Sequence, residues 1–177
     1  MFGLKRGTVI ISDHQSEWTY VASQTISELK NIFGEYACDI QHIGSTAIPS
    51  IKATPIIDIA AGVRSFSDLA PVLTGLEKAG WQKKHNRFSS DLLYVREENN
   101  IRTHQLHILI YGCEQWHNYI DFRDYMNAFP EKAKAYEVLK EQLVLSCGEI
   151  QTVYTDGKQE FMRKFLAEAR AYFKNRN

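Results

Sequence analysis

The fold is decided by residues 42–58, which read HIGSTAIPSIKATPIID. This stretch joins two predicted strands, over 38–44 and 55–63, through a turn rich in small residues. The second strand is almost continuously apolar, which is typical of a central strand that is covered on both faces. The stretch therefore predicts the middle of a sheet, with one carboxylate, Asp58, on its central strand.

Helix and strand patterns extend from this stretch in both directions. The predicted elements are a strand over 8–12, a helix from Ser16 to Gly34, the two strands named above, a helix from Ser67 to Gly80, strands over 91–96 and 104–111 joined by an Asn99-Asn100 hairpin, a helix over 115–128, a helix that begins at Pro130, and a last helix after Asp156-Gly157. We therefore predict an α+β fold of about five strands in residues 1–112 and a helical C-terminal third in residues 113–177. No long linker or internal repeat interrupts the chain, so residues 1–177 are expected to form a single domain.

Composition places the chain among ordinary folded proteins. Apolar residues make up 44% and charged residues 24% of the 177 residues, and 21 basic residues balance 21 acidic ones. This balance argues against a protein that holds nucleic acid mainly by neutralising phosphates. The three cysteines are not spaced as metal ligands, and no apolar run is long enough for a signal peptide or a membrane span. A cytoplasmic protein without a membrane partner is expected.

The Gly44-Ser45 turn and Asp58 carry the residue types of a phosphate site. Glycine lets backbone N–H groups approach an anion, and the serine hydroxyl adds a donor; a tight turn between strands is the alternative. Burying an unpaired carboxylate is costly, so Asp58 should meet a metal, a base or several N–H donors; a structural aspartate that bonds to loop amides is the alternative. Phosphate donors beside a carboxylate that can hold Mg²⁺ are what phosphoryl and nucleotidyl transfer require.

The strand over 104–111 adds a histidine pattern. Residues two apart on a strand share a face, so Gln105 and His107 are expected on one side and His104 on the other. His107 is a candidate to line a pocket, bind a metal or donate to a phosphate, and Arg102 is a candidate phosphate clamp. The alternatives are a satisfied core or rim histidine and a solvated arginine. Motifs G-x-S-x-G, C-x-x-C, H-E-x-x-H, G-x-G-x-x-G and Walker A are absent from the sequence.

Ordered blocks of sequence extend these features along nearly the whole chain. They read HIGSTAIP at 42–49, PIIDI at 55–59, RTHQLH at 102–107, FRDY at 122–125 and YTDGK at 154–158. In this order they closely resemble the GrpB family of uncharacterised proteins. GrpB proteins are similar in fold to the nucleotidyltransferase superfamily, so the resemblance implies a nucleotidyltransferase-like mixed β-sheet flanked by helices.

The resemblance also implies a site. In the superfamily a Gly-Ser turn precedes a strand with an acidic pair, and a later strand supplies a third carboxylate. The candidates here are Gly44, Ser45, Thr46, Arg102 and Lys158 for binding a nucleotide, Asp58 for Mg²⁺ and catalysis, and His107 for catalysis.

Two positions depart from the superfamily pattern. Ala60 stands where the second acid is expected, and His107 stands on the later strand in place of an aspartate. Within the family, Thr54 replaces a usual lysine, which removes a potential phosphate contact. Two-metal transfer needs ligands for both ions, and a second carboxylate would have to come from elsewhere, with Asp91, Glu97 and Asp121 as candidates.

Two functions remain open from the sequence. The first is a nucleotidyltransferase-like enzyme that binds a nucleotide or another phosphate-containing small molecule and transfers a nucleotidyl or phosphoryl group. The second is a non-catalytic descendant of the fold, a ligand-binding or protein-interaction module. For this second function, the resemblance to domains fused to dephospho-CoA kinase implies an accessory or folding-assistance role with a protein partner.

Overall fold

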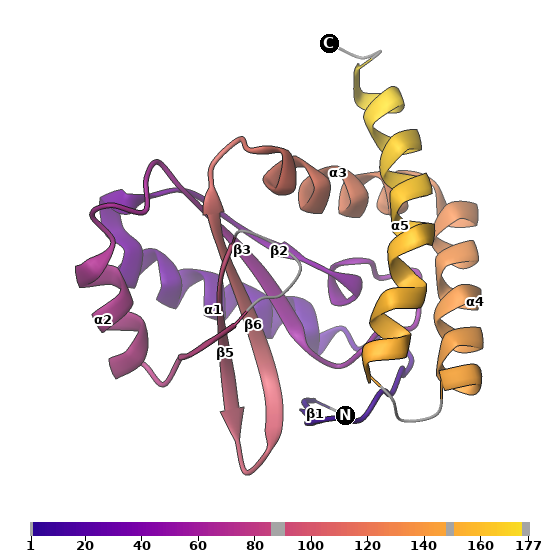
Figure 1. The fold of residues 1–177 in the computed structure, drawn as a ribbon, viewed down its shortest axis with the longest axis horizontal. Helices are drawn as coiled ribbons and strands as arrows, with labels where there is room; N and C mark the ends of the chain where they lie inside the picture. Colours follow the sequence, from indigo (N-terminus) through magenta and orange to yellow (C-terminus); the bar gives the residue numbers. More distant parts are fainter. Residues whose placement is uncertain (1, 86–90, 148–150, 175–177) are drawn as a thin grey trace.

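The computed structural model describes residues 2–85, 91–147 and 151–174, and of residues 147, 151–156, 158–160 and 174 it describes the backbone alone. At its centre lies a six-stranded mixed sheet in the order β2-β3-β6-β5-β4, with β1 beside one end of β6 (Figure 1). The strands are β1 (Leu4–Lys5), β2 (Ala37–Ile43), β3 (Ile57–Val63), β4 (Gln82–Lys84), β5 (Leu92–Glu98) and β6 (Ile101–Ile110). Strands β3 and β6 run parallel, and the other pairs run antiparallel.

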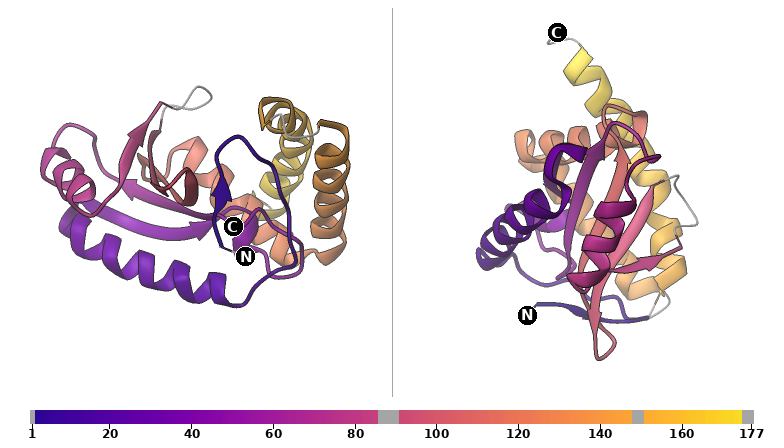
Figure 2. Two further views of the ribbon diagram at one scale, coloured as in Figure 1. Left: turned by 90° about the horizontal axis from the view of Figure 1, so that it is seen from below. Right: turned by 90° about the vertical axis from the view of Figure 1, so that its left-hand side faces the viewer.

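Helices cover both faces of this sheet (Figure 2). The helices are α1 (Glu17–Phe33), α2 (Ala70–Lys78), α3 (Glu114–Ala128), α4 (Pro130–Cys147) and α5 (Gln151–Lys174), with short 3₁₀ turns η1 (Gly34–Tyr36) and η2 (Ser45–Ala47). The main core joins α1 and α2 to one face of the sheet. A smaller cluster joins α3 to the other face, and a third core holds α3, α4 and α5 together.

Alternation along β3 and β6 decides what each face carries. Ile57, Ile59 and Leu106 are fully buried in the core beneath α1 and α2. Asp58 and His107 point to the face that α3 covers. Asp58 is the one residue of β3 that is not buried, so the sheet is partly open to solvent at this residue.

The hairpin between β5 and β6 forms where the Asn99-Asn100 pair predicted it. Asn99 and Asn100 have φ values of 51° and 64°, and Glu98 pairs with Ile101. Two consecutive positive φ values are those of a type I′ turn, whose twist matches that of the strands, and asparagine tolerates them.

Three elements differ from the sequence prediction, and the first is the short strand β4, which was not predicted. Residues 8–12 form no strand; only Ser12 makes a bridge, with Ala53, and the strand at this end of the chain is β1. The last helix begins at Gln151 and contains the Asp156-Gly157 pair that was expected to precede it. Gly157 faces α4 so closely that a Cβ would meet the Leu143 Cδ2 at 2.5 Å, so this glycine serves helix packing and is not a turn residue.

None of the helices in the described part of the chain is long and apolar enough to cross a membrane.

Candidate functional site

The Gly44 turn lies directly against the Asp58 carboxylate. Gly44 has a φ of 72°, and a Cβ at this position would lie 2.3 Å from the Asp58 Oδ2. Strands β2 and β3 pair so that Ile43 lies opposite Asp58, which sets the turn over the carboxylate. Both the backbone conformation and the contact therefore require glycine here.

The turn leaves backbone donors available beside that carboxylate. Its internal hydrogen bonds run from the Ala47 N–H to the Gly44 carbonyl and from the Ile48 N–H to the Ser45 carbonyl. Among the described residues, the N–H groups of Ser45 and Thr46 have no such acceptor. Successive unpaired N–H groups at a glycine turn form an anion-binding concavity.

Thr46 was predicted to bind nucleotide, but its hydroxyl is used to hold the turn together. It donates to the Ile56 carbonyl at 3.1 Å, so the His42 Nε2, at 2.9 Å, must donate to it. Burial, together with the nearby Arg123 and His14, lowers the pKa of His42 to about 4. The neutral His42 thus holds the turn in place through its hydrogen bond to the Thr46 hydroxyl. The hydrogen-bond donor that Thr46 has left for a ligand is its backbone N–H.

Asp58 is fixed by its neighbour on β6. The register places Gln105 beside Asp58, and the Gln105 Nε2 donates to the Asp58 Oδ1 at 3.0 Å. The sequence correctly put Gln105 and His107 on one face, but it gave Gln105 no role in holding the carboxylate.

His107 lies in the next row of the same face, beside Ala60. Its Nδ1 is 2.5 Å from the Asp91 Oδ2 and 3.3 Å from the Tyr119 hydroxyl on α3. Burial, with Asp91 and Asp58 adding to its effect, raises the pKa of Tyr119 well above its usual range. The structure therefore brings Asp58, His107 and Asp91 to one region under α3.

This glycine turn over a strand-borne carboxylate can now be compared with known proteins. A family model described as GrpB protein matches residues 8–168. The chain belongs to the GrpB family. The glutamate-rich protein GrpB of Alkalihalophilus pseudofirmus is 37% identical over 174 residues, which cover 95% of this chain and 99% of that protein. A Bacillus subtilis relative, the UPF0157 protein YqkA, is longer, and the chain spans 48% of it.

Solved structures extend the comparison to fold. The crystal structure of the conserved protein GrpB from Enterococcus faecalis matches with a TM-score of 0.83 at 26% identity, over 93% of this chain and 99% of that one. Cid1 in complex with its short product ApU matches with a TM-score of 0.53 at 11% identity, over 76% of this chain and 44% of that one. At this identity the likeness to Cid1 shows the fold alone. The predicted family and the nucleotidyltransferase-like α+β fold are confirmed.

Arg102, another predicted ligand of a nucleotide, is engaged elsewhere in this GrpB-family chain. The guanidinium of Arg102 binds the Glu97 carboxylate across the hairpin, with Nη2 to Oε2 at 3.1 Å, and does not reach the turn. Because of this contact, Glu97 is also committed and cannot serve as the missing second acid. The side chain of Lys158 lies outside the described residues.

The donor set does not fit a pair of Mg²⁺ ions. In the described parts of the chain, no three His, Cys, Asp or Glu side chains lie close enough together to hold a metal ion. Ala60, two residues after Asp58 on the same face of β3, has no side-chain oxygen to bind a metal ion. His107, which pairs with Ala60 across the sheet, is hydrogen-bonded to Asp91. Asp58 with the oxygens of a bound phosphate fits one Mg²⁺, which commonly takes a single carboxylate, substrate phosphates and waters. Such an ion would neutralise phosphate charge beside the carboxylate.

Sequence reasoning missed two residues that shape this site. Tyr119 contacts His107, and the Arg123 Nη1 donates to the His42 carbonyl and to the Gln41 Oε1, each at 2.8 Å. Arg123 lies in the FRDY block, so the family pattern held a signal for it. Tyr119 lies among the aromatic residues of α3, whose helical spacing is typical of packing side chains.

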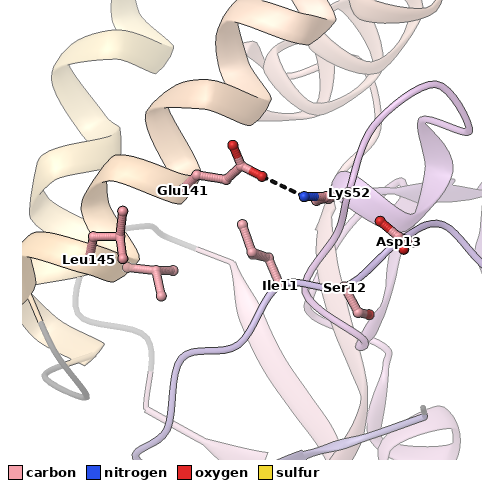
Figure 3. A pocket seen from close by; sticks show the side chains of 7 residues that line it. Ile11, Ser12, Asp13, Lys52, Glu141 and Leu145 are labelled. Carbon is pink, nitrogen blue, oxygen red and sulfur yellow. Dashed lines mark hydrogen bonds and ion pairs between the residues drawn. The ribbon is translucent and has the colours of Figure 1, made fainter.

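A separate open pocket of about 530 Å³ lies between the N-terminal segment and α4 (Figure 3). It is lined by Ile11, Ser12, Asp13, Lys52, Glu141, Val144 and Leu145. Among the described residues that line it, the one cation is the Lys52 ammonium, which is paired with Glu141 at 2.7 Å. The predicted site residues whose side chains are described do not line it.

Proposed function

We propose that this protein binds a nucleotide, or another phosphate-containing small molecule, at the Gly44-Ser45 turn and transfers a nucleotidyl or phosphoryl group from it. The observation that carries this proposal is the contact of the turn with Asp58, with the Ser45 and Thr46 N–H groups beside it. The N–H groups suit phosphate oxygens, and the carboxylate suits the cation that accompanies them. The nucleotidyltransferase-like fold, shared with a protein solved with a nucleotide product, supports the proposal.

Charge at the site makes a specific prediction for Asp58. A carboxylate repels a phosphate when no metal ion is present, whereas a Mg²⁺ ion between them attracts both groups. Replacing Asp58 with Asn should therefore weaken Mg²⁺-dependent nucleotide binding by about tenfold, a loss of about 1.4 kcal/mol, while strengthening binding in the presence of EDTA. The Asn side-chain oxygen can still accept from Gln105, so the fold is expected to persist. Calorimetric titration with ATP and with GTP, with Mg²⁺ and with EDTA, measures both effects.

The matched control is Asp68→Asn, which removes an exposed carboxylate ahead of α2. Its affinities should equal those of the wild type in both buffers. The proposal is lost if the wild-type chain binds neither nucleotide at millimolar concentration, or if Asp58→Asn and Asp68→Asn behave alike.

One observation favours a second candidate function, a non-catalytic ligand-binding module. Ala60 leaves the second acidic position empty, and catalysis through two ions needs that ligand. Under this function the chain binds nucleotide and leaves it unchanged. Incubating the complex with Mg²⁺ or Mn²⁺ and separating the nucleotides by anion-exchange chromatography distinguishes the two, because any product excludes a purely binding role.

A further inference from the structure

The pairing of His107 with Asp91 is a feature that phosphate binding leaves unexplained. Asp91 directly precedes β5, and its side chain is fully buried, whereas 13% of the His107 side chain is exposed. The carboxylate therefore lies behind the imidazole, and the ring is the part of the pair that a ligand can reach.

The contacts of the ring fix its tautomer. An ionised carboxylate only accepts hydrogen bonds, so the proton of the neutral imidazole lies on Nδ1, toward Asp91, and the lone pair lies on Nε2. Tyr119 supports the ring from α3, with ring centroids 5.1 Å apart. An imidazole whose Nδ1 proton is held by a buried carboxylate is arranged to accept a proton at Nε2.

The pair also lies beside the candidate phosphate site. His107 and Gln105 share one face of β6, and Gln105 holds Asp58. The Tyr119 hydroxyl lies 3.3 Å from the His107 Nδ1, and the Asp91 and Asp58 carboxylates both lie near enough to this phenol to raise its pKa. His107 thus pairs with Ala60, two residues along β3 from Asp58, and Asp58 is the residue that the Gly44 turn contacts.

Packing alone explains this pair poorly. Burying a carboxylate is costly, and exchanging a buried ionic pair for well-packed apolar side chains is often neutral or stabilising. The same face already has apolar neighbours in this position, since Ala60, Leu109 and Trp116 form a buried cluster beside it. A functional use of the imidazole accounts for both the buried acid and the partial exposure of the His107 side chain.

We propose that His107 is the general base of the transfer reaction and that Asp91 is its positioning residue. This inference rests on the proposed function, with a nucleoside triphosphate as donor and a hydroxyl group or water as acceptor. The His107 Nε2 takes the acceptor proton as the acceptor oxygen attacks the α-phosphorus. A P–O bond to the acceptor forms, the bond to the bridging oxygen breaks, and pyrophosphate leaves with the electron pair. The resulting imidazolium is stabilised by the Asp91 carboxylate.

The test separates binding from turnover in the full chain. Each of the four nucleoside triphosphates, labelled at the α-phosphate, is incubated with the protein and Mg²⁺, and transfer to water is measured as nucleoside monophosphate released. His107→Gln and Asp91→Asn should bind nucleotide within about twofold of the wild type and turn over at least about 100-fold more slowly. The control, His117→Gln, changes an exposed histidine of α3 and should match the wild type in both measurements.

A spectroscopic readout reports on Asp91 without any substrate. The ring ¹⁵N chemical shifts of His107 should show the Nδ1–H tautomer in the wild type and lose it in Asp91→Asn, because the new amide can donate to Nδ1. Should Asp91→Asn fail to fold, His107→Gln still decides the role of the base.

Each outcome has a distinct meaning. A wild-type chain that binds no nucleotide overturns the proposed function and this step with it. A wild-type chain that binds nucleotide without turnover overturns the general base together with the transfer part of the proposed function, and leaves only the binding part standing. Turnover by His107→Gln at the wild-type rate overturns the general base alone. An unchanged tautomer in folded Asp91→Asn overturns the positioning role of Asp91.

Discussion

Lowering the pH from 7 to 4 is expected to remove roughly 6 kcal/mol from the free energy of unfolding, because the buried His104 and the partly buried His42 must stay neutral in the folded chain. Burial, aided by neighbouring cations, lowers the pKa of both His42 and His104 from 6.5 to about 4. Between these values the unfolded chain binds more protons than the folded chain. Their contribution is therefore fully present above pH 6.5 and falls as the pH drops toward 4, by roughly 3 kcal/mol for each histidine.

The contacts of His104 show why protonation is resisted. Thr25 donates its hydroxyl to the Val21 carbonyl, so the His104 Nε2, 3.2 Å away, must donate to Thr25. The Thr103 hydroxyl lies 2.8 Å from Nδ1 and 3.4 Å from the Arg96 carbonyl, so it donates mainly to the nearer Nδ1 of the neutral ring. A second proton on the ring would face that donor, with the Arg96 guanidinium close enough to add repulsion.

Urea unfolding curves at several pH values between 7 and 4 measure this dependence. His42→Gln and His104→Gln should each flatten it by about half of the total, since glutamine keeps a side-chain N–H donor and does not titrate. Carboxylates titrate in the same range, so the comparison is between variants, with the exposed His117→Gln as the control. Equal pH dependence in all four proteins would contradict the assignment.

The fold could be predicted largely because its decisive signals are local. The apolar run of β3, the small residues of the Gly44 turn and the Asn99-Asn100 pair each act within a few residues of where they stand. The ends of helices and strands could not be predicted in this way where they depend on contacts with residues far away in the sequence. Gly157 looks like a helix breaker until α4 is placed against it.

The site could be located but not completed from the sequence. Gly44 and Asp58 were found because a glycine turn and a carboxylate in an apolar run are visible as patterns. The partners of His107 were not, because Asp91 meets it only through the register of the β5–β6 hairpin, and Tyr119 only through the packing of α3. Such contacts depend on geometry that no spacing rule expresses.

A buried lysine on α4 shows the same limit, since lysine is almost never fully buried without a partner. Lys140 is 1% exposed, donates from Nζ to the Lys52 carbonyl, and lies 4.8 Å from the Tyr136 ring centroid. One turn earlier, the Glu137 Oε2 accepts the Lys52 N–H at 3.0 Å. Two buried charges of α4 thus hold both backbone groups of one residue in the segment that follows the Gly44 turn.

Replacing Lys140 with Met should therefore destabilise the protein by about 2–3 kcal/mol, because it deprives the Lys52 carbonyl of its charged donor and removes the cation that lies over the Tyr136 ring. The control is Lys52→Ala, which keeps these backbone contacts and removes only the half-exposed ion pair with Glu141, a loss of at most about 1 kcal/mol. Urea unfolding at pH 7 compares the two. The double variant Glu137→Gln/Lys140→Met should depart from the sum of the two single changes, since both residues hold the backbone of Lys52. Similar stabilities for Lys140→Met and Lys52→Ala would show that α4 is held by its aromatic core, and that this charged contact with the segment after the turn contributes little.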